Sequence, residues 1–69
     1  MNRIISIIMT DLATDILKNE EAMESAINSK ELDIDSRIEA IKHHLGKIVE
    51  LEKMIEKWRT YTSQVNNND

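Results

Sequence analysis

Apolar residues recur at steps of three and four positions along most of this chain, with charged residues between them. In the first half, the stripe has one polar position, Asn19 or Glu20, between Ile16 and Met23. Its members are Ile5, Ile8, Leu12, Ile16, Met23 and Ile27. Because these steps match the 3.6-residue period of an α-helix, we expect a helix from about Arg3 to about Asn28.

The second half carries the stronger periodic signal. Its stripe consists of Ile34, Ile38, Ile41, Leu45, Ile48, Leu51, Ile55, Trp58, Thr62 and Val65. Two consecutive three-residue steps, from Leu45 to Ile48 to Leu51, interrupt the heptad alternation. The pattern predicts a second helix over about residues 36–64.

Polar residues separate the two stripes and favour a loop at about 29–35. Asp33, Asp35 and Ser36 are each able to accept hydrogen bonds from the free amides of a helix start. Ser36 and Glu39 also have the spacing of a capping box. The sequence therefore predicts an all-α fold, a long antiparallel helical hairpin in one domain over residues 1–65. The polar tail at 66–69 is expected to be disordered.

Gly46 introduces an alternative. It follows His43 and His44, and a glycine after histidines resembles a helix end with a left-handed cap. A break there would give three helices. The apolar steps continue through Gly46, which favours one continuous helix. A short strand is a second alternative for the isoleucine-rich segment 4–9, but it requires a strand partner.

Composition points to association between chains. The 69 residues include no cysteine, no proline and one glycine. At this length a single chain buries only about 60% of the surface that it exposes when unfolded, so small domains need disulfides, metals or partners. Without cysteine we expect dimerisation into a four-helix bundle or coiled coil. The residues expected at the oligomer or partner interface are Ile4, Ile7, Ile8, Met9, Leu45, Ile48, Leu51, Ile55, Trp58 and Tyr61.

The net charge of −4 disfavours nucleic acid and anionic membranes as partners. The apolar start ends at Thr10, well short of the roughly 20 residues that span a bilayer. We therefore expect a cytoplasmic protein. The richness in Ile, Asn and Lys is typical of AT-rich coding sequences such as phage or mobile-element genes, for which the address would be the host cytoplasm.

Candidate chemistry is sparse. Glu39 and His43 share a helix face at metal-compatible spacing, but the chain offers no cysteine and two histidines, whereas structural zinc takes four ligands. Phosphate loops, nucleophile elbows and HExxH motifs are missing from the sequence. The sequence thus predicts no catalytic residue, no cofactor and no enzyme activity.

The charged residues divide between the halves, since the first is acidic and the second contains most of the lysines. One interpretation is that the two helices complement each other within the hairpin. Another is a basic strip for RNA, composed of Arg37, Lys42, His43 and Lys47.

These patterns favour a non-enzymatic, oligomerising protein that acts by protein–protein interaction, as a regulator, inhibitor or adaptor. Two alternatives stay open. One is an RNA-binding four-helix bundle that uses the basic strip. The other is a small-ligand binder whose pocket forms between subunits.

Overall fold

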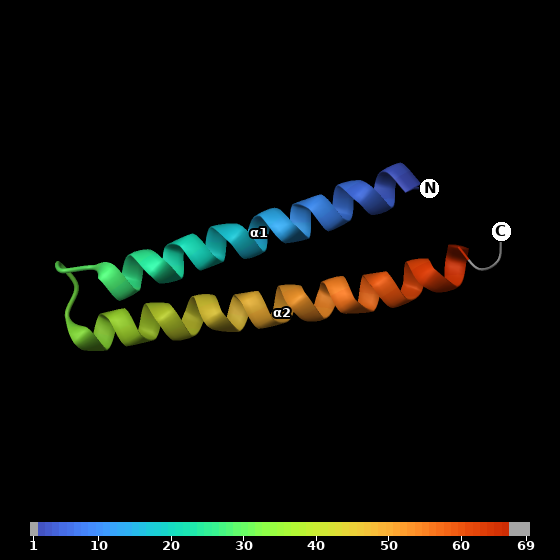
Figure 1. The fold of residues 1–69 in the computed structure, drawn as a ribbon. Helices are drawn as coiled ribbons and strands as arrows, with labels where there is room; N and C mark the ends of the chain where they lie inside the picture. The colour runs from blue at the N-terminus through green and yellow to red at the C-terminus, as the bar shows by residue number, and fades with distance from the viewer. Residues whose placement is uncertain (1, 67–69) are drawn as a thin grey trace.

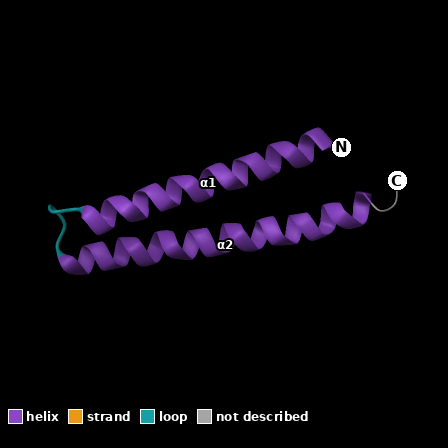
Figure 2. Ribbon diagram, viewed as in Figure 1, coloured by secondary structure: helices purple, strands orange, loops and turns teal. Residues whose placement is uncertain are grey.

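Two long helices make up the fold. The computed structural model describes residues 2–66, with the side chains of residues 3–63. Helix α1 spans Asn2–Asn28 and helix α2 spans Ile34–Asn66. The helices lie side by side and antiparallel, so that the start of α1 and the end of α2 lie at the end opposite the loop (Figure 1). The described part of the chain contains no strand, which confirms the all-helical hairpin (Figure 2).

Helix α2 runs through Gly46 without a break, so the three-helix alternative is wrong. Gly46 has a negative φ and therefore does not form a left-handed cap. The isoleucine-rich segment 4–9 is likewise helical, not a strand. The backbone amides and carbonyls of this segment form hydrogen bonds within α1, so the segment needs no strand partner.

The loop comprises residues 29–33 and is shorter than expected, because α2 already begins at Ile34, directly after Asp33. The Asp33 carboxylate accepts a hydrogen bond from the Ser36 amide at 3.1 Å, and its carbonyl accepts one from the Arg37 amide at 3.0 Å. Asp33 is therefore the N-cap, and the expected capping box of Ser36 with Glu39 is not used. These hydrogen bonds to Ser36 lower the pKa of Asp33 below its ordinary value. On the other side of the loop, the Ser29 hydroxyl accepts the amides of Glu31 and Leu32.

The contact line between the helices, which we call the seam, is regular. On α2 it follows alternating four- and three-residue steps through buried or half-buried residues. These are Arg37, Ile41, His44, Ile48, Leu51, Ile55, Trp58 and Thr62. This pattern is an uninterrupted heptad repeat. The expected irregularity at Leu45 is therefore wrong, because His44 occupies that seam position and Leu45 is 49% exposed.

Other residues of the predicted stripes also lie off the seam. Ile34 and Ile38 are exposed, and Arg37 takes the seam position. On α1, Ala26 is buried while Ile27 is exposed. Heptad geometry decides which residue faces the neighbouring helix, and a larger apolar side chain one position away stays outside. Asn66, the first residue of the expected tail at 66–69, is the last residue of α2, so the expectation of disorder is wrong at that position. The side chain of Val65, the last residue of the predicted stripe, and the whole of residues 67–69 lie outside what the structure describes.

Candidate interaction surfaces

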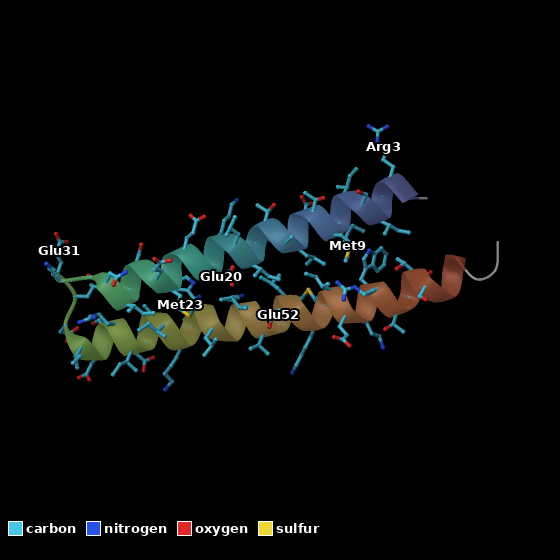
Figure 3. The ribbon with its side chains drawn as sticks, viewed as in Figure 1. Arg3, Met9, Glu20, Met23, Glu31 and Glu52 are labelled. Carbon is cyan, nitrogen blue, oxygen red and sulfur yellow. The ribbon has the colours of Figure 1, made fainter. Side chains whose placement is uncertain are left out.

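The hairpin buries very little of its apolar content. Among the described residues, Ala26 and Ile48 alone are buried hydrophobic residues. Large hydrophobic side chains that remain exposed are Ile4, Ile7, Leu17, Ile27, Leu32, Ile34, Ile38, Leu45, Val49, Met54 and Tyr61. Scattered exposed hydrophobic residues are normal on any protein, but contiguous apolar surface usually marks an interaction site. Figure 3 shows Met9 and Met23 directed toward α2, whereas Arg3 points away from it.

One groove lies between the helices near the chain ends. We call it the open-end groove. Its volume is about 550 Å³, and it is lined by Ile8, Leu12, Lys53, Met54, Lys57 and Trp58. Apart from the two lysines, every lining side chain is apolar or aromatic. Ile8 and Trp58 are among the residues that the sequence predicted at an oligomer or partner interface.

Trp58 forms one wall of the open-end groove. Its ring stacks on that of Tyr61, with a centroid separation of 5.5 Å and an interplanar angle of 5°. The indole Nε1 is buried and has no hydrogen-bond partner. A buried donor without a partner is destabilising by about 1–3 kcal/mol. Burial of the indole must therefore outweigh this penalty within the hairpin.

A second groove lies on the opposite side of the seam. It is lined by Ser6, Met9, Thr10, Ala13, Thr14, Leu17, Ile55 and Arg59. The neighbouring residues Ile8 and Met9 of α1 lie on opposite sides of the seam, since Ile8 lines the open-end groove and Met9 lines the second groove. Its walls are more polar, because serine and threonine hydroxyls contribute to them. In the half of α2 that follows the loop, Ile38, Leu45 and Val49 are exposed.

The seam itself contains a polar pair. Nδ1 of His44 lies 2.9 Å from Oδ1 of Asn19, and Nδ2 of Asn19 donates to the carbonyl of Asp15 at 2.8 Å. Since Oδ1 can only accept, Nδ1 of His44 is the donor. The sequence indicated a polar interruption of the first stripe at Asn19 or Glu20, and it gave the matching position of the second stripe to Leu45 rather than to His44. It did not reveal that Asn19 and His44 meet.

The residues of the expected basic strip have different environments. Arg37 is half-buried, and its guanidinium donates to the carbonyl of Ala26 at 3.1 Å and to that of Ile27. It therefore closes the last turn of α1, whose carbonyls have no partner within the helix. Lys42, His43 and Lys47 are exposed. The structure thus leaves three of the four strip residues open to solvent.

The metal candidates Glu39 and His43 are both exposed on α2. The ring of His43 packs edge-on against His44, with centroids 5.1 Å apart. Across the part of the chain that the structure describes, no three His, Cys, Asp or Glu side chains gather closely enough to hold a metal ion.

Comparisons with protein families, with curated proteins and with solved structures found no match for this chain. In the described residues, neither helix is sufficiently long and apolar to span a bilayer.

Proposed function

We propose that this protein is a non-enzymatic interaction module, which self-associates into a helical bundle and acts on another protein as a regulator, inhibitor or adaptor. The observation that carries the proposal is the imbalance between buried and exposed apolar residues. Two hydrophobic residues are buried among those described, while eleven large ones are exposed. An isolated hairpin gains too little from such burial to offset its conformational entropy, so further apolar surface must be covered.

The kind of surface also supports protein interaction. Both grooves are open channels along two helices, a shape that suits another helix. Among the described residues no polar or charged side chain is buried. Acid–base catalysis depends on such groups, held in an environment that separates their pKa values. The open channels thus favour binding over chemistry.

The basic strip provides weaker support for the RNA alternative. Arg37 is engaged with α1, and the acidic net charge of the whole chain opposes approach to a phosphate backbone. A small ligand between subunits is the third alternative. The open-end groove is the place where such a ligand would compete with a second helix.

Sedimentation equilibrium of the full chain tests the proposal. We expect a dimer or a higher oligomer at micromolar concentration, with helical circular dichroism retained. Ile48→Asp places a charge at a buried seam position, which should unfold or dissociate the protein. A helical, thermally stable monomer at that concentration would refute self-association.

A further inference from the structure

The side of the hairpin that carries the open-end groove has a specific charge pattern. We call this side the groove face. Three exposed residues on α1 follow Ile8 at steps of three and four positions and therefore lie on the same face. Their charges are, in order, negative, negative and positive. The residues are Asp11, Asp15 and Lys18. Three exposed residues on α2, read toward its N-terminus, have the signs plus, plus and minus. They are Lys57, Lys53 and Glu50.

The two charge series have equal spacing. From Asp11 the steps are four and then three residues toward the C-terminus. From Lys57 the steps are four and then three residues toward the N-terminus. In an antiparallel pair of helices, the two series therefore match couple by couple with opposite signs. At the register set by the Asn19–His44 contact, the two members of each couple are offset by about five residues, or ~7.5 Å, along the axis. Side chains of both helices lean toward their own N-termini, which brings the long lysine side chains closer to the carboxylates along the axis.

The hydrogen bonds between the two helices of one hairpin do not use this complementarity. The side-chain hydrogen bonds between α1 and α2 in the described residues run from Arg37 to the carbonyls of Ala26 and Ile27, and from His44 to Asn19, and none of them involves a carboxylate. The interpretation that the two helices complement each other in charge within one hairpin stays a prediction. Lys53 and Lys57 line the groove, beside the apolar side chains of Met54 and Trp58.

The occupant of the groove needs an apolar stripe with acidic residues next to it. Helix α1 has both features, because Ile4 and Ile7 are 61% and 51% exposed and Asp11 and Asp15 follow them. We propose that a second copy of this chain docks on the groove face. Its α1 lies antiparallel against α2, about a twofold axis that runs along the hairpin. The proposal rests on the self-association proposed above, and adds the face and the orientation.

This orientation places both loops at the same end of the dimer. It joins the open-end grooves of the two copies, so Ile4 of each copy lies on the same side as Met54 and Tyr61 of the other, at the end where apolar surface is concentrated. The opposite orientation would stack α1 on α1 and α2 on α2. Asp11 and Asp15 would then face acidic residues, and like charges across an interface are strongly unfavourable. A twofold axis also closes the assembly at two chains.

A mixing experiment tests the charge pairing. The acidic-strip variant is Asp11→Lys with Asp15→Lys, and the basic-strip variant is Lys53→Glu with Lys57→Glu. Each alone would juxtapose like charges, so its dimer should dissociate on the order of 100-fold more readily than the wild type. Mixed in equal amounts, the two variants should form a heterodimer that again associates, because every reversed residue meets a reversed partner.

Rescue by mixing separates association from folding, since charges that act within one chain cannot be restored by a different chain. Glu20→Lys with Glu24→Lys is the matched control. Both residues are exposed on α1, away from the groove face, and the charge change is the same. We expect this variant to dimerise as the wild type does. If the mixture stays dissociated, or if the control dissociates equally, the charge pairing is refuted.

Orientation is measured on a chain with a single spin label. The sequence contains no cysteine, so Lys30→Cys gives one labelling site in the loop. We expect a label-to-label distance far shorter than the 54 Å length of the hairpin. A distance close to that length would show the opposite orientation and overturn the inference, while self-association would stand. A monomeric protein would instead refute the self-association proposed above.

Discussion

His44 of α2 donates its Nδ1 proton to Oδ1 of Asn19, across 2.9 Å of an otherwise mostly apolar seam. This pair joins residues 25 positions apart, and it fixes which turn of α1 lies beside which turn of α2. A single polar residue in a coiled-coil seam is a known means of specifying register, at a loss of stability. We infer that Asn19 and His44 set the register of the hairpin.

The first prediction concerns this pair. Asn19→Leu leaves the His44 donor without its acceptor, so the free energy of unfolding should fall by about 1–3 kcal/mol. His44→Leu should have a similar effect through the Asn19 carbonyl oxygen. The double variant replaces both groups by apolar ones, and it should recover most of the loss. Urea unfolding of the four proteins gives the coupling energy, and strictly additive losses would argue against the pair.

Gly46 provides the second prediction. It lies within α2, exposed to solvent, and a Cβ atom built there meets nothing within 4 Å. Gly46→Ala should therefore stabilise the protein by about 0.5–1 kcal/mol, because alanine loses less backbone entropy in a helix. Thermal unfolding followed by circular dichroism measures the gain. A lower melting temperature would mean that another chain approaches α2 at Gly46.

The third prediction concerns Arg37, which connects the start of α2 to the end of α1. Its two hydrogen bonds satisfy carbonyls in the last turn of α1. Arg37→Ala should lower the free energy of unfolding by about 1.5–3 kcal/mol, as expected for bonds from a charged donor. Lys42→Ala, at an exposed position, is the control and should stay within about 0.5 kcal/mol. Equal losses in both variants would contradict a specific role for Arg37.

The fourth prediction follows from Asp33 at the start of α2. Its hydrogen bonds to Ser36 lower its pKa in the folded state from the ordinary 3.8. The stabilisation is therefore complete above the unfolded pKa, and is lost as the pH falls through the lower folded pKa. Asp33→Asn keeps a capping side chain that does not titrate. The difference in melting temperature between the wild type and Asp33→Asn should change only on the acidic side of pH 3.8. A difference that is independent of pH would exclude this role for the Asp33 carboxylate.

Periodicity was sufficient to predict two antiparallel helices and their loop, because the 3.6-residue repeat extends over both halves of the chain. It was not sufficient to choose between neighbours such as His44 and Leu45. Hydrophobicity favours leucine at the seam, but the heptad geometry set by Ile41, Ile48 and Leu51 places the histidine there. Similarly, the sequence placed Arg37 in a basic surface strip. Its hydrogen bonds to α1 could not be predicted, because they depend on how the loop folds back.

The open-end groove was indicated in outline, because Ile8 and Trp58 belong to segments that an antiparallel hairpin brings together. The charge series on the groove face was less accessible from the sequence. Asp11 and Lys57 share a face only once the seam positions are known, and the seam was predicted with Leu45 and Ile27 in place of His44 and Ala26.

The final prediction uses Trp58, the single tryptophan of the chain and one wall of the open-end groove. Within the hairpin its indole nitrogen is already buried, and its ring stacks on Tyr61. We therefore expect blue-shifted, quencher-resistant emission from the associated protein. If a second copy covers the groove, dilution below the dissociation constant should shift the emission to the red, because the groove then opens to water. Emission unchanged across the dissociation range, measured in parallel by sedimentation, would mean that the second copy docks elsewhere.

Truncation of the same side chain separates packing from association. Trp58→Ala removes the groove wall, and loss of a packed aromatic ring typically lowers stability by about 3–5 kcal/mol. If the ring mainly serves the dimer interface, the variant should instead keep its helical content at high concentration while dissociating more readily, by about 2 kcal/mol or more. Tyr61→Ala is the matched comparison, since Tyr61 is 56% exposed and stacks on the same ring. Because Tyr61 contributes little to the seam, its removal should weaken the dimer with a smaller change in the unfolding of the hairpin. A Tyr61 variant that dimerises as the wild type does would place the interface away from this end of the molecule.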